Sequence, residues 1–473
     1  MSNALRTDGT EITGLTCDSR KVAPGFLFAA LPGAKADGRA FVADAVARGA
    51  SAILALPGVE AAVPTLSDTN PRRAYARLAA RFHGGQPEMV AAVTGTNGKT
   101  STVTFLRQIW THLGMPAASI GTLGIASPVF TVESGLTTPD AADLHRDLKR
   151  LKDGGVEHLA MEASSHGLDQ FRLDGVRIAA AAFTNLTRDH LDYHPSMEAY
   201  LQAKLRLFRE VVSPSGAAVV NADSPAAGAV VAACQARNLK VLTYGRAGAD
   251  LRLKDIRALP EGQRLDLEVR GRAFAVTLPL LGRFQAENAL CALGLALALG
   301  EDPAAAVGAL AGLQGPPGRL EWTARHPNGA PVVVDYAHTP DALATVLAAL
   351  RPHVNVNGRL IVVFGCGGDR DPGKRPEMGR IAAEAADLAI VTDDNPRSED
   401  PAAIRAAILA AAPGAREIAD RMEAIRAAVR EMKPGDLLLI AGKGHERGQI
   451  VGGQVFPFDD REAARHAVGE VSA

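Results

Sequence analysis

Val90-Ala-Ala-Val-Thr-Gly-Thr-Asn-Gly-Lys-Thr-Ser101 predicts a buried strand that runs through a glycine turn into a helix. Gly95 and Gly98 let backbone N–H groups converge on a phosphate at the N-terminus of that helix. Lys99 adds a point charge, and the Thr100 hydroxyl is a candidate ligand for Mg²⁺. The strict G-x-x-x-x-G-K-[ST] pattern fails because Val93 occupies the first glycine position. The alternative is a glycine turn that ends in an exposed lysine.

From this strand onward, predicted strands and helices follow one another along the chain. The strands are predicted at 90–93, 158–161 and 179–183, and the helices at 99–113, 286–299 and 304–313. This alternation predicts a mostly parallel sheet with helices on both faces. Residues 251–281 instead alternate polar and apolar side chains around Pro260, which predicts an antiparallel insertion.

Two further α/β units flank the central one. Residues 25–31 and 52–56 are predicted strands around a helix at 40–48. Gln314-Gly-Pro-Pro-Gly318 has the composition of a linker. Strands predicted beyond it are 332–334, 360–364, 388–391 and 437–440, and helices 341–350, 377–386, 402–411 and 422–432. The sequence thus predicts three α/β domains: a small one at 1–87, a central P-loop-type domain at 88–317, and a Rossmann-like domain at 318–473.

Composition narrows the functional classes. Lys and Arg number 51 against 52 Asp and Glu, so a general surface for nucleic acid is not expected and phosphate recognition must be local. The four cysteines show no C-x-x-C pairing, which argues against a zinc site or a disulfide framework. The N-terminus lacks a signal-peptide pattern, and helix 286–299 is too short for a bilayer of about 30 Å. We therefore expect a soluble, cytoplasmic protein without a membrane partner.

Polar side chains follow the predicted strands, where ligands of open α/β sheets bind. Glu162 begins Glu162-Ala-Ser-Ser-His-Gly167 and is a candidate Mg²⁺ ligand, although a loop-capping glutamate is the alternative. Lys204 lies on an apolar helical stripe with Tyr200 and Phe208. A buried ammonium needs a partner or neutralisation, and the alternative is a lysine whose amine extends to solvent.

The loop Thr94-Gly-Thr-Asn-Gly-Lys-Thr100 resembles the nucleotide loop of Mur ligases and of folylpolyglutamate synthases. The resemblance to Mur ligases extends through the chain. It implies transfer of the ATP γ-phosphoryl group to a substrate carboxylate, followed by attack of an amine on the acyl phosphate. The loop residues that would contact ATP are Gly95, Thr96, Asn97, Gly98, Lys99, Thr100 and Ser101.

The same resemblance assigns catalytic and metal-binding roles. Two Mg²⁺ ions are implied, with Thr100 and Glu162 as ligands and His190 beside the second ion. The segment A-K-x-x-L-F resembles the one whose lysine is carbamylated, so Lys204 is expected to carry a carbamate that binds Mg²⁺ or steadies the phosphoryl group. The catalytic set is Lys99, Glu162, His190 and Lys204. His194 is interpreted as a possible surface residue.

Later segments add expected ATP contacts. Gly282-Arg-Phe-Gln-Ala-Glu-Asn-Ala289 resembles a helix entry near the nucleotide; Gln285 departs from the family's first asparagine and Asn288 matches the second. Arg319 is expected at the ATP phosphates and Asp335 at the ribose, both when the third domain closes over ATP. For each of these two the alternative is a surface ion pair.

Shorter motifs indicate where the UDP-linked substrate would bind. Asp18-Ser-Arg20, with Ser19, and the loop 33–39 resemble the UDP-binding loops of the tripeptide-forming branch. Residues that resemble its muramoyl-peptide contacts are Thr137, Thr138, Ser164, Gln170 and Arg172.

Asp394-Asn-Pro-Arg397 resembles the D-N-P-R of diaminopimelate-adding enzymes, whereas lysine-adding relatives carry another residue at the position of Arg397. Meso-diaminopimelate differs from lysine by one distal carboxylate, which a guanidinium binds bidentately. Leaving that arginine unpaired would cost about 3–5 kcal/mol if fully buried, or roughly two to three decades of discrimination. The expected diaminopimelate contacts are Arg370, Asp394, Asn395, Pro396, Arg397, Gly442 and Glu446, with Glu446 at the distal ammonium. Without Arg370 and Glu446, a surface turn arginine would be an equal alternative.

The expected substrates are ATP, UDP-N-acetylmuramoyl-L-alanyl-D-glutamate and meso-diaminopimelate, joined by a monomer during synthesis of peptidoglycan precursors. Use of L-lysine or L-ornithine is improbable but open. A folylpolyglutamate synthase should lack the D-N-P-R and G-K-G-H-E segments. A non-catalytic ATP-binding scaffold should have lost Lys99, Glu162 or Lys204, and all three are present. A motor ATPase would need a Walker-B aspartate, which we do not identify.

Overall fold

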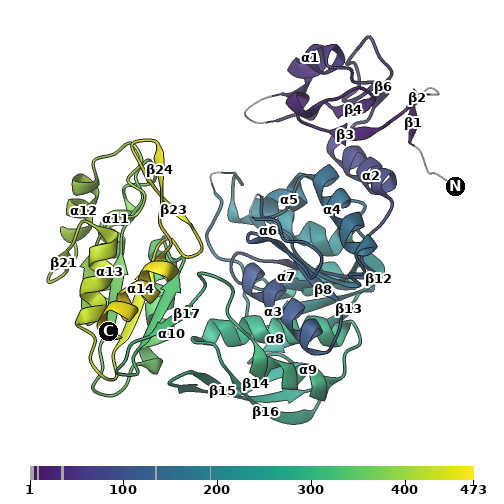
Figure 1. Ribbon diagram of the computed structural model, residues 1–473. Coiled ribbons are helices and arrows are strands. Elements are labelled where there is room, and N and C mark those ends of the chain that lie inside the picture. Colours follow the sequence, from purple (N-terminus) through teal and green to yellow (C-terminus); the bar gives the residue numbers. More distant parts are fainter. Residues whose placement is uncertain (1–4, 8–9, 34–36, 134–135, 192, 473) are drawn as a thin grey trace. The chain divides into compact units, whose positions relative to one another are not determined.

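The computed structural model describes residues 5–7, 10–33, 37–133, 136–191 and 193–472. The chain forms two compact units (Figure 1). The first contains Met1–Leu253, Glu268–Arg272 and Asn288–Ala309, and the second contains Lys254–Leu267, Ala273–Glu287 and Leu310–Ala473. In the described part of the chain, the three main sheets have four, ten and six strands.

The N-terminal sheet has the strand order β3-β4-β5-β6, and every neighbouring pair is parallel. Its strands are β3 (Gly14–Thr16), β4 (Phe26–Ala29), β5 (Ala52–Ala55) and β6 (Thr65–Ser67). The accompanying elements are β1 (Arg6–Thr7), β2 (Thr10–Glu11), η1 (Ser19–Lys21), η2 (Gly38–Phe41), α1 (Val42–Ala47) and α2 (Pro71–His83). Asn70 caps α2 by accepting a hydrogen bond from the Arg73 N–H, and Gly84 ends it at φ +67°.

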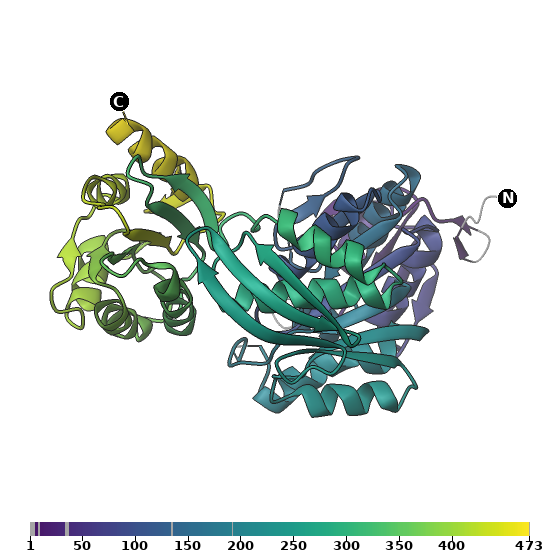
Figure 2. The ribbon, with the colours of Figure 1, turned by 90° about the horizontal axis from the view of Figure 1, so that it is seen from below.

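The central sheet has the order β16-β15-β14-β13-β12-β11-β7-β10-β8-β9, and helices lie on both sides of it (Figure 2). Its strands are β7 (Met89–Thr94), β8 (Ala117–Gly121), β9 (Gly124–Ala126), β10 (His158–Glu162), β11 (Ile178–Phe183), β12 (Val212–Asn221), β13 (Lys240–Gly245), β14 (Leu251–Leu259), β15 (Gly262–Val269) and β16 (Arg272–Leu278). Its helices are α3 (Lys99–His112), α4 (Ala141–Asp153), α5 (Ser165–Asp169), α6 (Met197–Arg206), η3 (Leu207–Val211), α7 (Ala227–Gln235), α8 (Arg283–Ala298), α9 (Pro303–Ala309) and η4 (Leu310–Gly312).

Strand β7 lies between β10 and β11 and runs parallel to both. The carboxyl ends of these three strands therefore meet at one edge of the sheet, which brings their following loops together. The insertion at 251–281 forms β14, β15 and β16, which are neighbours in the sheet and are joined by two-residue connections. Connections this short require antiparallel strands, so the predicted insertion is confirmed.

The C-terminal sheet has the order β17-β18-β22-β19-β20-β21. In the described part of the chain, β17 and β18 pair antiparallel, and all other neighbouring strands of this sheet are parallel. The strands are β17 (Glu321–Arg325), β18 (Pro331–Asp335), β19 (Leu360–Phe364), β20 (Leu388–Val391), β21 (Arg416–Glu417) and β22 (Leu437–Ala441), and a hairpin follows of β23 (Gly448–Val451) and β24 (Gln454–Pro457). The helices are α10 (Pro340–Leu350), η5 (Arg351–His353), α11 (Lys374–Ala385), α12 (Pro401–Leu409), α13 (Arg421–Arg430) and α14 (Asp460–Ser472).

Apolar side chains cover both faces of the C-terminal sheet in two clusters. One cluster includes Val333, Val362 and Leu439, and the other includes Val334, Val363 and Ile440. Successive strand residues point to opposite faces, so these continuous apolar runs are those of a sheet buried on both sides. Among the described residues, no helix has the length and apolar character needed to cross a membrane.

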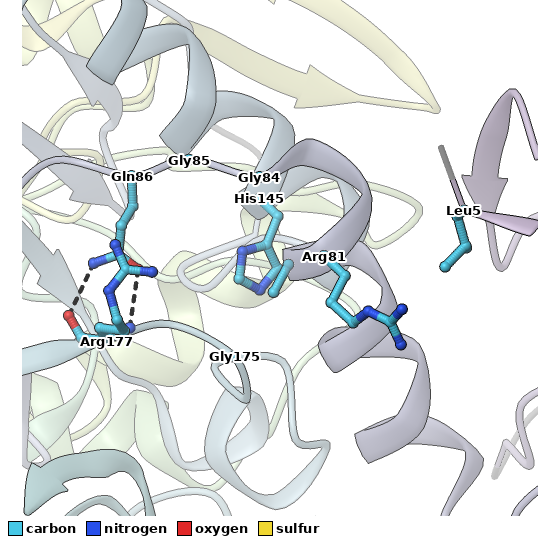
Figure 3. Close-up of a pocket in the computed structure, with 9 residues that line it drawn as sticks. Leu5, Arg81, Gly84, Gly85, Gln86, His145, Gly175 and Arg177 are labelled. Carbon is cyan, nitrogen blue, oxygen red and sulfur yellow. Dashed lines mark hydrogen bonds between the residues drawn. The ribbon is translucent and has the colours of Figure 1, made fainter. Parts of the chain in front are cut away.

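The segment between α2 and β7 is fixed by a side-chain amide. The Gln86 Nε2 donates to the Arg177 carbonyl at 3.0 Å, and the Gln86 Oε1 accepts from the Arg177 N–H at 2.9 Å (Figure 3). Gln86, Arg81, His145 and Arg177 belong to the lining of a cavity of about 330 Å³. That cavity contains none of the side chains that the sequence assigns to the active site.

His145 makes folding sensitive to acid. Its ring is buried, its Nε2 lies 3.3 Å from the Asp174 carbonyl, and burial lowers its pKa to about 4. The unfolded chain therefore takes up a proton near pH 6.5, whereas the folded chain takes it up only near pH 4. The free energy of unfolding must fall as the pH drops through this window. We expect His145→Gln to reduce the stability lost between pH 7 and pH 5 by about 2 kcal/mol in urea unfolding. His112→Gln, on an exposed position of α3, is the control, and equal pH dependence of His145→Gln and wild type would contradict the expectation.

Candidate active site

The phosphate loop has the predicted conformation. β7 ends at Thr94, Gly95 has φ +147°, Gly98 has φ +86°, and α3 begins at Lys99. Both glycines are required on steric grounds as well, because an added Cβ would lie 1.9 Å from the Thr184 Oγ1 at Gly95 and 2.2 Å from the Asn288 Oδ1 at Gly98. The loop therefore presents its backbone at the N-terminus of α3, where an anion is favoured.

The segment after β11 fixes this loop. The Thr96 N–H donates to the Asn185 carbonyl at 2.9 Å, and the Asn97 N–H donates to the Asn185 Oδ1 at 2.9 Å. The Thr184 Oγ1 donates to the Asn97 carbonyl at 2.6 Å. The loop conformation is thus held by neighbouring protein groups before any ligand binds.

Lys99 and Lys204 converge on one carbonyl oxygen. The Lys99 Nζ donates to the Gly95 carbonyl at 2.9 Å and to the Thr96 carbonyl at 2.8 Å. The Lys204 Nζ donates to the same Gly95 carbonyl at 2.8 Å. Two residues that are far apart in the sequence therefore meet at the phosphate loop.

Lys204 is only 1% exposed, so its amine does not extend to solvent as the alternative interpretation required. The Nζ lies 4.2 Å from the centroid of the Tyr200 ring, and the Tyr200 hydroxyl donates to the Thr96 Oγ1 at 3.3 Å. Burial, and next the charge of Lys99, hold the pKa of Lys204 well below its usual value. A lower pKa increases the fraction of the neutral amine, which is the nucleophilic form.

Glu162 ends β10 beside the phosphate loop, in register with Val93. It is 1% exposed, and Thr122 holds both carboxylate oxygens. The Thr122 N–H donates to Oε1 at 2.8 Å, and its hydroxyl donates to Oε2 at 3.2 Å. The carboxylate is therefore fixed in direction, and through Thr122 it also caps the turn after β8, as in the alternative of a loop-capping glutamate.

His190 belongs to a cluster of rings. It has φ +54°, and its ring centroid lies 5.0 Å from that of His166 and 6.0 Å from that of Tyr200. His194 is 4% exposed and lies 5.2 Å from Tyr200 between ring centroids, so its interpretation as a surface residue is wrong. The physical reason is that α6 brings the apolar ring of Tyr200 under this loop, where the histidine rings pack on it.

Most of the candidate muramoyl-peptide residues share one network. The Thr138 Oγ1 accepts from the Ser164 N–H at 3.1 Å. Arg172 donates to the Thr138 carbonyl and to the Gln170 Oε1, both at 2.7 Å. The Thr137 Oγ1 lies 3.1 Å from the Thr122 Oγ1, which connects this network to Glu162.

The candidate UDP loops belong to the N-terminal sheet. Ser19 lies in η1 and is buried, and Asp18 caps this turn by accepting from the Arg20 N–H. In the loop 33–39, residues 34–36 lie outside the described residues, and Asp37 caps η2. Asn288, on α8, lies beside the phosphate loop, because its Oδ1 occupies the space where a Cβ at Gly98 would be, and its role as an ATP contact stays a prediction.

Arg319 and Asp335 lie in the second unit, where Asp335 is buried and Arg319 is partly exposed. The Arg319 guanidinium lies 4.7 Å from the centroid of the Tyr336 ring. Asp335 accepts from the Leu320 N–H and the Ala337 N–H, each at 2.7 Å, and burial raises the pKa of its carboxyl. Asp335 is therefore not a surface residue, although the charge of Arg319 acts on its carboxyl and opposes the effect of burial on its pKa. The Asp335 carboxylate also has a structural role, because it fixes the turn that carries Arg319.

The candidate amino-acid residues surround the carboxyl ends of β20 and β22. Arg397 has φ +52°, its N–H donates to the Ile450 carbonyl at 2.9 Å, and its Nη1 donates to the Gly368 carbonyl at 2.7 Å. The Asn395 Nδ2 donates to the Glu446 Oε2 at 3.0 Å. Asp394 and Pro396 are in the same buried turn. Gly442 lies close to this turn, since an added Cβ would be 2.6 Å from the Asp394 Oδ2. Arg370 is exposed. The hairpin β23–β24 thus holds the arginine in a conformation that costs free energy for a non-glycine residue.

Family models match three parts of the chain. The model of the Mur ligase family catalytic domain matches residues 11–83, that of the Mur ligase middle domain matches 93–296, and that of the Mur ligase glutamate ligase domain matches 318–444. The UDP-N-acetylmuramoyl-L-alanyl-D-glutamate–2,6-diaminopimelate ligase of Bradyrhizobium diazoefficiens is 56% identical over 463 residues, which are 97% of this chain and 95% of the relative. The chain belongs to the Mur ligase family.

Other comparisons agree with this assignment. The ligase of the same description from Caulobacter vibrioides is 57% identical over 471 residues, which cover 98% of this chain and 96% of the relative. A solved structure of such a ligase matches with a TM-score of 0.77 and 36% identity, covering 99% of this chain and 98% of that one. The predicted α/β architecture of three Mur ligase domains is confirmed.

The donors near the phosphate loop of this Mur ligase suit Mg²⁺ in the presence of a nucleotide. Among the described residues, no group of three or more His, Cys, Asp or Glu side chains could hold a metal ion by itself. Mg²⁺ is usually bound by one or two carboxylates together with water and substrate phosphates, so a closed protein cage is not required. Thr100, at the start of α3, and the oriented carboxylate of Glu162 fit that pattern.

Several residues that complete the site were missed from the sequence. Thr122 orients Glu162, Tyr200 faces the amine of Lys204, and Lys443 lies beside Asn395 and Glu446. The apolar stripe that places Tyr200 one helical turn before Lys204 was a usable signal for that contact. Thr122 carried none, because its contact with Glu162 depends on the pairing of β8 with β10.

Proposed function

We propose that this Mur ligase is the ATP-dependent enzyme that adds meso-diaminopimelate to UDP-N-acetylmuramoyl-L-alanyl-D-glutamate. One observation carries the proposal: Lys99 and Lys204 meet at the Gly95 carbonyl of a phosphate loop, in a chain that is 56% identical to a ligase of that description. The proposed division into domains is 1–87 for the UDP substrate, 88–317 for ATP, and 318–473 for closure and the amino acid. The proposed setting is the cytoplasmic synthesis of peptidoglycan precursors by a monomer.

The chemistry requires a carboxylate oxygen of the dipeptide to attack the γ-phosphorus of ATP, which releases ADP and leaves an acyl phosphate. The amine of the second substrate then attacks the acyl carbon, the amide forms, and inorganic phosphate leaves with the bonding electrons. Phosphoryl transfer of this kind depends chiefly on in-line positioning and on neutralising charge. The loop N–H groups from Gly95 to Ser101, Lys99 and Asn288 would position the triphosphate.

Two Mg²⁺ ions would neutralise phosphate charge when bound. Thr100 and Glu162 would hold one ion, and His190 with the carbamate of Lys204 would lie at the other. For carbamylation, the neutral Lys204 amine attacks carbon dioxide and loses one proton, which creates an anion at a buried position. Burial beside Tyr200 and the lowered pKa of Lys204 support this modification.

Recognition of the other substrates follows from the remaining side chains. Ser19, Thr137, Thr138, Ser164, Gln170 and Arg172 would contact the UDP-muramoyl dipeptide. Arg319 and Asp335 would reach the ATP phosphates and ribose. Arg397 and Arg370 would bind the distal carboxylate of meso-diaminopimelate, Glu446 would bind its distal ammonium, and Asp394, Asn395, Pro396 and Gly442 would shape the pocket.

Phosphate release from ATP tests this function. The purified chain is given ATP, Mg²⁺, the UDP-muramoyl dipeptide, and one of meso-diaminopimelate, L-lysine or L-ornithine. We expect release with meso-diaminopimelate and roughly two to three decades less with L-lysine at equal subsaturating concentrations. Equal release with all amino acids would refute the proposed specificity, and release with none of them would refute the ligase activity.

A further inference from the structure

A fully buried lysine lies at the candidate amino-acid site and has no role in the proposal above. Lys443 follows β22 and is 0% exposed. Its Nζ donates to the Asn395 Oδ1 at 2.9 Å and lies 3.5 Å from the Glu446 Oε2 and 3.8 Å from the Asp394 Oδ1. Burying an ammonium costs much free energy unless it is paired, so these contacts account for its position.

Asn395 transmits this contact to Glu446. Its Oδ1 accepts from both the Lys443 Nζ and, at 3.0 Å, the Ile450 N–H. With the oxygen fixed by two donors, the amide nitrogen must face the other way, where it donates to the Glu446 Oε2 at 3.0 Å. Lys443 and Asn395 therefore engage one oxygen of a carboxylate that is partly exposed.

The balance of charge around this cluster depends on Lys443. Asp394 and Glu446 contribute two negative charges, and the Lys443 Nζ is the ammonium that lies 3.8 Å from the first carboxylate and 3.5 Å from the second. Nearby, Arg421 and Asp460 form a fully buried pair that is neutral as a whole. Removing Lys443 would make the surroundings of these two carboxylates more negative by one charge, which favours a bare ammonium and disfavours a carboxylate.

We propose that Lys443 is a positioning residue that orients Asn395 and Glu446 and balances their charge, so that the site selects an amino acid whose distal end carries both an ammonium and a carboxylate. This inference rests on the proposed function. It adds a determinant of specificity that does not itself touch the substrate.

Lys443→Met tests the inference, because methionine keeps the length and apolar volume of the side chain without its charge. We expect the KM for meso-diaminopimelate to rise about 10- to 100-fold, the magnitude of losing a hydrogen bond to a charged group. The KM for L-lysine should stay within about threefold or fall, because the site becomes more negative. Steady-state phosphate release measures both, and the KM for ATP should be unchanged.

Two further substitutions separate positioning from folding. Lys443→Arg keeps the charge and should restore most of the preference for meso-diaminopimelate. Lys443→Gln removes the charge but keeps a donor, and it gives the same test if the methionine variant does not fold. Arg359→Met is the matched control, since it removes the partner of the buried Asp436 at 2.7 Å and leaves the amino-acid site intact.

The inference is overturned if a folded, uncharged Lys443 variant keeps the wild-type preference, or if its KM values for both amino acids rise equally. Its failure is distinguishable from failure of the proposed function. If only the inference about Lys443 fails, the wild-type chain still releases phosphate selectively with meso-diaminopimelate. If the proposed function fails, the wild-type chain does not.

Discussion

Lys204→Ala is expected to lower turnover by about three orders of magnitude at saturating substrates. Lys204 donates to the Gly95 carbonyl and is buried against Tyr200, so its truncation removes a polar group from the interior beside the phosphate loop. With Lys204 carbamylated, its removal would delete an anionic group that holds Mg²⁺, the ion that would neutralise the charge of the transferred phosphoryl group. The reduction should appear in kcat, with the KM for the UDP-muramoyl dipeptide within a few-fold of wild type.

Bicarbonate gives a second measurement of the same prediction. Because alanine has no amine, adding bicarbonate should not restore turnover of Lys204→Ala. In the wild-type chain, labelled bicarbonate should give a carbamate carbon signal in the ¹³C NMR spectrum, and this signal should be absent from the variant. Lys240→Ala, at an exposed position of β13, is the control and should have normal turnover. Near-normal activity of Lys204→Ala would refute the assigned role.

The fold was predictable where local sequence alone determines it. The strand, glycine turn and helix from Met89 to His112 were predicted within one residue at each end, because apolar strand residues and two glycines leave few alternatives. Helices α2 and α4 were not predicted. Their arginine-, lysine- and alanine-rich sequences have apolar faces that become clear only when the two helices pack on each other.

The candidate site was predictable to a similar extent. Glu162 and Lys204 were identified by their places after a strand and on an apolar stripe, and both lie beside the phosphate loop. Thr122 and Lys443 could not be found this way, since their partners are 40 and 48 residues away in the sequence. His194 was misjudged for the same reason, because its burial depends on rings from α5 and α6.

Arg397→Ala is expected to lower kcat/KM for meso-diaminopimelate by about one to two decades, the effect of losing hydrogen bonds between charged groups, while the KM for ATP stays within about twofold. The guanidinium is half-buried and anchored by one hydrogen bond to the Gly368 carbonyl, and a guanidinium has five donors. Its loss leaves the distal carboxylate of the substrate without a charged partner in a site that also contains Asp394 and Glu446.

The backbone of Arg397 makes the choice of replacement informative. The hairpin fixes the backbone of Arg397 at φ +52° through the Ile450 carbonyl and the Gly452 N–H. A substitution therefore changes the side chain while these hydrogen bonds hold the backbone in place. Arg397→Lys keeps the charge but not the planar fork, and should recover only part of kcat/KM. Arg380→Ala, which removes a surface pair with Glu384, is the control. Use of L-lysine should be unchanged or improved in Arg397→Ala, because lysine has no distal carboxylate to lose a partner and its binding no longer leaves an arginine unpaired. If both amino acids were affected equally, the arginine would be a structural residue of the turn rather than the group that distinguishes them.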